Sequence, residues 1–169
     1  MNQTLYLLRH AKAEPWYPGV NDFSRPLSDK GNRHMANLCP WAVERIAAPE
    51  AVLCSSSTRT RETIEPFLGI WPGVEDRTTY TDEIYEASTG TLHELAMQAF
   101  QTASSVMMVG HNPGFEYLAL AVMSDADANR IAKMATGTLA VIEFAGGYEA
   151  DAGNGQLRHW ITRKDFSGN

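Results

Sequence analysis

The stretch LYLLRHAKAEPW (residues 5–16) begins with four apolar residues and then changes abruptly to Arg9 and His10. A short, continuously apolar run that ends in polar residues is typical of a strand buried inside a sheet. The two polar side chains at its end then need either solvent or a negatively charged partner. The segment therefore predicts a buried first strand over residues 4–8 that presents Arg9 and His10 at its carboxyl end.

Five further segments have strand-like patterns. The clear ones cover residues 51–56, 104–111, 137–145 and 157–162, and a weaker extended segment covers 78–85. A turn rich in Gly, Asn and Asp joins the last two segments and has the composition of a hairpin. These two strands are therefore expected to add an antiparallel edge to the sheet.

Helical patterns lie between the strands, at 25–47, 57–69 and 91–100. Ser28 is a start signal for the first helix, and Pro40 is expected to kink or interrupt it. Alternation of strands and helices with short connections predicts a three-layer α/β/α sandwich around a mostly parallel central sheet.

The bulk composition limits the function classes. The chain has 169 residues, of which 44% are hydrophobic and 20% charged, as in an ordinary globular protein, and we expect a single domain over residues 1–169. A net charge of -6 argues against a general nucleic-acid binder. The sequence shows no signal peptide and no apolar run near the ~20 residues of a membrane span, so we expect a cytoplasmic protein without membrane contact.

Two cysteines, Cys39 and Cys54, are too few for a disulfide framework or a cysteine-rich metal site. Cys54 follows the apolar residues AVL and is predicted to be a small buried side chain. The Asp, Glu and His residues show no familiar metal-ligand spacing, so no metal is expected.

Three of the predicted strands end in residues capable of chemistry. The first ends in Arg9 and His10, the second leads through a Ser/Thr run to Arg59 and Arg61, and the third ends in GHN (110–112). In an open α/β sheet, ligands bind beyond the carboxyl ends of the strands, so these groups are expected to converge. Arginines match phosphate oxygens, and their charge lowers a neighbouring histidine pKa, which keeps a ring nitrogen free to attack. The pattern predicts a pocket for a dianion.

The other histidines have simpler interpretations. His34 lies in a polar helical stretch and is expected at the surface, whereas His93 and His159 are expected to be structural. In GHNPG (110–114), Asn112 is expected to cap the following helix with a proline at the first helical position. Such capping does not exclude a catalytic role for the preceding histidine.

In this order, the motifs resemble those of the histidine phosphatase superfamily, which has a phosphoglycerate mutase-like fold. The first motif is LRHA (8–11), with alanine where many members have glycine. The second, Ser-x-x-x-Arg-x-x-x-Thr, is matched by Ser55, Arg59 and Thr63, and the third by Gly110–His111. The resemblance extends over nearly the whole chain. Further segments narrow it to the short SixA-type phosphohistidine phosphatases: DFSRPLSDKG (22–31), IYEAS (84–88), GHNPG (110–114) and MATGTLAVIEF (134–144).

The resemblance implies a role for each matched residue. His10 would be the nucleophile that forms a phosphohistidine intermediate, and Arg9 and Arg59 would hold the phosphate oxygens. His111 would stabilise the transferring phosphoryl group. Phosphoryl transfer of this kind depends on positioning and charge neutralisation and requires no cofactor.

The sequence does not decide which residue would act as a general acid that protonates the leaving group. By position Glu86 is the first candidate and Glu83 the second, and an exposed loop carboxylate is an equal interpretation of Glu86. Arg25 could border the pocket or pair with Asp22, and Arg61, two residues into a helix, is expected to point elsewhere.

The implied activity is hydrolysis of phosphohistidine on a protein, for example a histidine phosphotransfer domain. The alternative is a small-molecule or sugar phosphomonoesterase that uses the same site. A mutase needs a closed, water-poor site that a short chain has little material to build. A non-catalytic phosphoprotein-binding module is opposed by the complete set of two histidines and two arginines.

Overall fold

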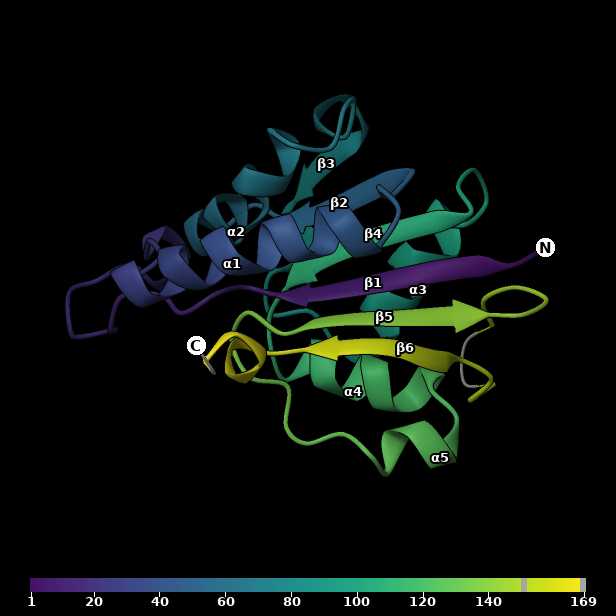
Figure 1. The fold of residues 1–169 in the computed structure, drawn as a ribbon. Helices are drawn as coiled ribbons and strands as arrows, with labels where there is room; N and C mark the ends of the chain where they lie inside the picture. Colours follow the sequence, from purple (N-terminus) through teal and green to yellow (C-terminus); the bar gives the residue numbers. More distant parts are fainter. Residues whose placement is uncertain (150–151, 168–169) are drawn as a thin grey trace.

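The computed structural model describes residues 1–149 and 152–167, and its frame is a six-stranded sheet with the strand order β3-β2-β4-β1-β5-β6 (Figure 1). Short 3-10 helices cover Asp22–Ser24, Glu75–Arg77, Asp82–Ile84 and Arg163–Phe166. The strands and α-helices are β1 (Gln3–Arg9), α1 (Asp29–Arg45), β2 (Ala51–Ser55), α2 (Thr58–Leu68), β3 (Thr78–Thr81), α3 (Thr89–Ala99), β4 (Ser105–Gly110), α4 (Gly114–Val122), α5 (Asp125–Ala128), β5 (Leu139–Phe144) and β6 (Gln156–Ile161).

The strand directions confirm the predicted mostly parallel sheet. β1 pairs in parallel with β4, β4 with β2, and β2 with β3. β5 runs antiparallel to β1, and β6 runs antiparallel to β5, which is the expected antiparallel edge. The turn between β5 and β6 includes residues 150–151, which lie outside the described residues. The carboxyl ends of the neighbouring strands β2, β4 and β1 therefore meet at one edge of the sheet.

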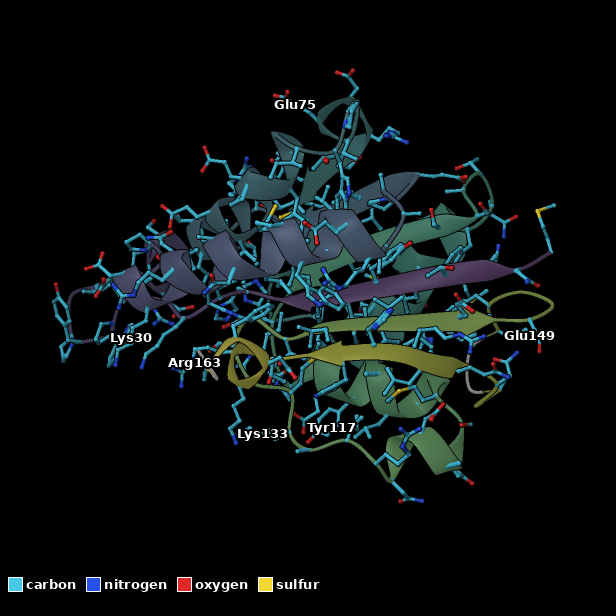
Figure 2. The ribbon with its side chains drawn as sticks, viewed as in Figure 1. Lys30, Glu75, Tyr117, Lys133, Glu149 and Arg163 are labelled. Carbon is cyan, nitrogen blue, oxygen red and sulfur yellow. The ribbon has the colours of Figure 1, made fainter. Side chains whose placement is uncertain are left out.

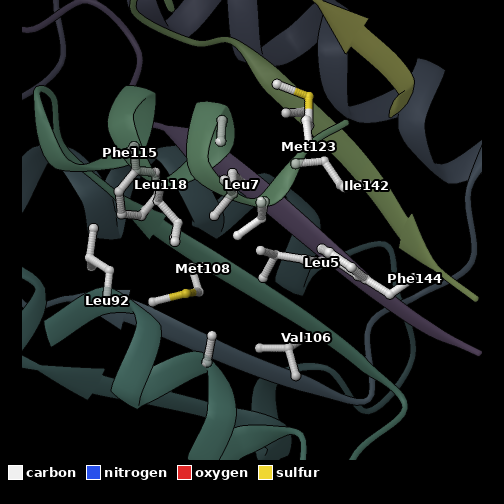
Figure 3. Close-up of a cluster of buried hydrophobic side chains, with 14 of the residues drawn as sticks. Leu5, Leu7, Leu92, Val106, Met108, Phe115, Leu118, Met123, Ile142 and Phe144 are labelled. Carbon is white, nitrogen blue, oxygen red and sulfur yellow. The ribbon is translucent and has the colours of Figure 1, made fainter. Parts of the chain in front are cut away.

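Both faces of the sheet are covered, which gives the three layers. In β1 the side chains alternate: Leu5 and Leu7 pack in the core beneath α3 and α4, whereas Tyr6 and Leu8 pack beneath α1 and α2. Figure 3 shows the first of these cores, where Leu7 lies near Leu118 of α4 and Leu5 lies toward Phe144 of β5. Because β1 is buried on both faces, its sequence is continuously apolar rather than alternating.

The first helix differs from its prediction at Pro40. Ser28 caps α1 as expected, since its side chain accepts a hydrogen bond from the Gly31 N–H group. The helix nevertheless continues through Pro40 to Arg45, so Pro40 does not interrupt it, whereas the expected kink stays a prediction. Pro40 and Ala36 are exposed, and the Ala36 carbonyl that loses its helical partner can be hydrated there.

Two further predictions are corrected. Asn112 does not cap α4; its side-chain amide donates instead to the Met134 carbonyl and the Glu116 carboxylate, and α4 begins at Gly114. His34 is buried rather than at the surface, because its Nε2 atom donates to the Gly137 carbonyl at 2.9 Å. These errors have one cause. Both side chains donate hydrogen bonds to carbonyls in the loop before β5, and that loop is distant from both residues in the sequence.

The cysteines are buried, as predicted for Cys54. Within residues 1–149 and 152–167, no helix combines the length and apolar character needed to cross a membrane.

Candidate active site

The ends of β1, β2 and β4 bring the two motif histidines together. Arg9 lies in register with Gly110 of β4, and the His10 N–H group donates to the Gly110 carbonyl at 2.9 Å. The imidazole rings of His10 and His111 lie with their centroids 5.3 Å apart. The convergence predicted from the strand ends is therefore confirmed for these histidines.

His10 is held as a neutral imidazole with one nitrogen free. Its side chain is buried, and Nδ1 lies 2.7 Å from the Ala11 carbonyl. A carbonyl can only accept, so Nδ1 carries the proton and Nε2 keeps its lone pair. Burial, followed by the charges of the neighbouring arginines, lowers the pKa of His10 to about 4, although the Ala11 carbonyl acts in the opposite direction. At neutral pH, Nε2 is a nucleophilic atom.

His111 is also neutral at physiological pH. Burial lowers its pKa to about 3, and the nearby His10 and Arg59 add to that effect. Its Nε2 atom lies 2.8 Å from the Ser55 hydroxyl, and the Tyr85 ring meets its ring edge-on with centroids 5.4 Å apart. Its buried Nδ1 atom has no hydrogen-bond partner among the described residues. His111 therefore has one nitrogen fixed and a second, buried nitrogen whose hydrogen-bonding capacity is unused within the described residues.

The two motif arginines are each fixed at one end of the guanidinium group. Arg59 is 5% exposed and donates from Nη1 to the Asp22 carbonyl at 2.7 Å and from Nη2 to the Asp22 carboxylate at 3.1 Å. Arg9 donates from Nη1 to the Met134 carbonyl at 2.7 Å. In the described part of the chain, neither buried Nε atom has a partner. Each guanidinium group thus keeps N–H donors of the kind that binds phosphate oxygens.

The second motif owes its spacing to the start of α2. Ser55 ends β2, and Arg59 and Thr63 lie on successive turns of the helix. The Thr63 hydroxyl donates to the Arg59 carbonyl at 2.6 Å and accepts the Ala11 N–H group at 3.0 Å. Thr63 therefore connects α2 to the residue that follows His10, which fixes the arginine relative to the histidine.

Asp22 and Tyr85 belong to the site but were not among the predicted site residues. The Asp22 carboxylate accepts from the Tyr85 hydroxyl at 2.7 Å, from Arg25 at 2.7 Å and from Arg59 at 3.1 Å. Burial alone would raise the pKa of Asp22, but these partners outweigh it and lower the pKa to about 2. The only sequence signal was the spacing of Asp22 and Arg25. Nothing in the sequence singled out Tyr85.

The remaining candidates form no hydrogen bond to the two histidines or the two motif arginines within the described residues. The Arg25 guanidinium is paired with Asp22, one of the two arrangements expected for it. Arg61 lies over the Tyr80 ring, 4.0 Å from its centroid, and points away from the histidines as expected. Glu86 is exposed, with φ at 53°, and its side chain forms no hydrogen bond or ion pair within the described residues.

Glu83, the second candidate acid, is also exposed, and its carboxylate accepts from the Thr81 hydroxyl at 3.5 Å. No group of three His, Cys, Asp or Glu side chains in residues 1–149 and 152–167 is arranged to hold a metal ion.

Known proteins share this fold. No family model matches the chain. The uncharacterized protein Rv1276c of Mycobacterium tuberculosis is 34% identical over 146 residues, which cover 82% of this chain and 88% of the relative. A solved structure from Agrobacterium tumefaciens, provisionally assigned as the phosphohistidine phosphatase SixA, is 29% identical with a TM-score of 0.83 and covers 95% of this chain and 97% of its own.

A second provisionally assigned SixA, from Nakamurella multipartitia, is 27% identical with a TM-score of 0.80, and the match covers 96% of each chain. A protein histidine phosphatase SixA solved with tungstate is 18% identical with a TM-score of 0.77, covers 97% of this chain and 99% of its own, and supports the fold alone. The chain belongs to the histidine phosphatase superfamily. Within it, the protein is a phosphatase, a hydrolase with a phosphoglycerate mutase-like fold.

Proposed function

We propose that the protein hydrolyses phosphohistidine on a protein substrate, with His10 as the nucleophile. The lone pair of His10 Nε2 attacks phosphorus, a new N–P bond forms, and the N–P bond of the substrate breaks. The electron pair returns to the substrate imidazole, which leaves as a neutral ring when its other nitrogen carries a proton. Water then attacks the phosphorus on His10: an O–P bond forms, the N–P bond to His10 breaks, and its electron pair returns to Nε2. Inorganic phosphate leaves with the protons of the water, and neutral His10 is restored.

The other members of the cluster stabilise the charge that moves during these steps. Arg9 and Arg59 each offer N–H donors to the phosphate oxygens, and their positions are fixed by backbone carbonyls. His111 offers its Nδ1 atom. Because Arg59 and His111 are buried and Arg9 is half-buried, their interactions with phosphoryl oxygens act in a low dielectric and need little rearrangement.

The protonation state of Asp22 indicates which leaving group the site can serve. Within the described residues, Asp22 is the only carboxylate hydrogen-bonded to a member of the cluster, and a pKa of about 2 keeps it ionised at neutral pH. Asp22 therefore has no proton to give to an alkoxide leaving group. An imidazole leaving group does not need that proton, so the site suits phosphohistidine better than a phosphate ester. The likeness to the two SixA proteins supports the same substrate class.

Turnover of two substrate classes tests this proposal. The wild-type protein and Glu86→Gln are each given a histidine-phosphorylated phosphotransfer domain and a panel of phosphate monoesters. We expect a higher kcat/KM for the phosphodomain, and a change below about 3-fold in that value for Glu86→Gln, because the leaving imidazole needs little general-acid help. Rapid ester hydrolysis with no dephosphorylation of the domain would overturn the proposal.

A small-molecule phosphomonoesterase is the second candidate, and the backbone at Glu86 favours it. A glutamate with φ at 53° occupies the left-handed region, which costs energy for a residue with a side chain and often marks a functional position. This candidate predicts that Glu86→Gln abolishes ester hydrolysis. Glu83→Gln, at an exposed position three residues earlier, is the matched control and should retain activity.

A further inference from the structure

The positive charge of this acidic protein is concentrated in one place. The chain carries a net charge of -6, yet six of its 14 Lys and Arg residues line a single cavity of about 640 Å³. Figure 2 shows Lys30, Lys133 and Arg163 on the same side of the molecule, whereas Glu75 and Glu149 lie elsewhere. We call this cavity the cationic groove, and its charged lining consists of Lys12, Lys30, Arg130, Lys133, Arg163 and Lys164 together with one acid, Asp165.

The cationic groove lies next to the catalytic cluster and shares a wall with it. Ala135 and Thr136 line the groove. The residues on either side of them contact the cluster: the Met134 carbonyl accepts from Arg9 at 2.7 Å, and the Gly137 N–H group donates to the His10 carbonyl at 2.8 Å. Only this short segment therefore separates the groove from the cluster.

The form of the groove indicates the kind of partner. All six basic side chains are exposed, and in the described part of the chain only Arg130 forms an ion pair, with Asp127. The acid in the groove, Asp165, is occupied by the Thr162 N–H and hydroxyl groups. These long side chains come from four separate segments, and all but Arg130 lack an ion pair in the described part of the chain, unlike the few fixed polar groups of a small-ligand site. They match a broad, negatively charged surface instead.

We infer that the cationic groove docks an acidic surface of the protein that carries the phosphohistidine. This inference rests on the proposed function and names the partner's chemistry. The rest of the enzyme is acidic and repels such a partner, so attraction at the groove also orients it with its phosphohistidine toward His10. The groove would then govern association with the protein substrate and have no part in the hydrolysis of small esters.

A double neutralisation with a matched control tests the docking role. Lys133→Gln with Arg163→Gln removes two charges from the groove, and Arg45→Gln with Arg158→Gln removes two exposed charges outside it. The substrates are an acidic, histidine-phosphorylated phosphotransfer domain and para-nitrophenyl phosphate. Binding of the same phosphodomain to the groove variant and the control, each in a His10→Ala background that cannot turn it over, is measured by fluorescence anisotropy.

For the groove variant we expect KM for the phosphodomain to rise and binding to weaken about 5- to 10-fold, the scale for losing two exposed ion pairs. The kcat for the domain, the ester hydrolysis and the control variant should stay unchanged. Unchanged binding in the groove variant, or no binding by the wild-type groove, would overturn the inference. So would a rise in KM for a bisphosphorylated small ester without an effect on the domain. If the domain binds through the groove but is not dephosphorylated, the proposed function fails while the docking role stands.

Discussion

The catalytic cluster and the cationic groove lie on opposite sides of one short wall and are built in opposite ways. In the cluster, His10, His111 and Arg59 are buried, and hydrogen bonds fix each of them. In the groove, side chains such as Lys133 and Lys164 are exposed and form no hydrogen bonds within the described residues. Fixed, buried polar and charged groups stabilise a transition state, whereas exposed charges attract and orient a partner. The cluster is thus built for the chemical step, and the groove is built for binding a partner.

Among variants that keep the nucleophile, the largest effect is expected from the loss of a cluster arginine. Arg59→Ala should lower kcat at least ~10²-fold, because it removes charge stabilisation of the transferring phosphoryl group. Arg9→Ala should lose activity on the same scale. Steady-state kinetics on the phosphodomain give both values.

Arg61→Ala is the matched control for Arg59→Ala. It lies on the same helix with its guanidinium over Tyr80, and its kcat should stay within about 2-fold of wild type, as for a surface position. Near-normal activity of Arg59→Ala would contradict the role of the cluster. A large loss of activity in Arg61→Ala would contradict the placement of Arg61 outside the cluster.

A smaller effect is expected from the backbone that supports the cluster. An added Cβ at Gly110 would lie 2.5 Å from the Phe115 ring and 2.7 Å from Ile84. Gly110→Ala should therefore lower the free energy of unfolding by about 1–3 kcal/mol, the usual cost of overpacking a core. Urea denaturation measures the change.

Gly90→Ala serves as its control, because the added Cβ meets only the Ser88 hydroxyl at 3.8 Å within a helix. It should be neutral or stabilising by up to about 1 kcal/mol. Equal losses in the two variants would show that Gly110 has no special packing role.

The smallest change is expected when the pH is lowered. His10 has its pKa lowered to about 4, so Nε2 stays unprotonated well below pH 6.5. Between pH 7.5 and 5.5, kcat/KM for para-nitrophenyl phosphate should change less than about 2-fold, whereas a nucleophile with an ordinary pKa would lose about 10-fold. A midpoint near 6.5 would show that burial does not control this histidine.

Stability should respond to pH even where activity does not. The unfolded chain protonates its histidines near pH 6.5, whereas the folded chain resists until about 4 for His10 and about 3 for His111. The unfolded state therefore binds more protons in this window, and the free energy of unfolding falls as the pH is lowered through it. Thermal melts in a pH series would show a declining Tm below 6.5.

Much of this arrangement was predictable because it depends on local pattern and strand direction. The apolar run of β1 and the polar residues at its end were enough to place Arg9 and His10 at the edge of the sheet. Parallel pairing then brought His111 to the same edge. These inferences needed only the period of the strands and the rule that parallel strands end together.

Contacts between distant segments were not predictable in the same way. Tyr85 reaches Asp22 across 63 positions of sequence, and His34 reaches Gly137 across 103. Neither residue carries a local signal for such a contact. The cationic groove likewise assembles from segments around residues 12, 30, 130 and 163, and each contributes too few charges to stand out in the sequence.

The central claim is that His10 carries the phosphoryl group between substrate and water. Wild-type protein and His10→Ala are mixed with a ³²P-labelled phosphohistidine domain, quenched within milliseconds in alkali and mapped by mass spectrometry. We expect the label on His10 in the wild type, no label on His10→Ala, and at least a ~10³-fold loss of turnover in the variant, as for removal of a covalent nucleophile. Dephosphorylation of the domain by His10→Ala at a near-normal rate would contradict the account.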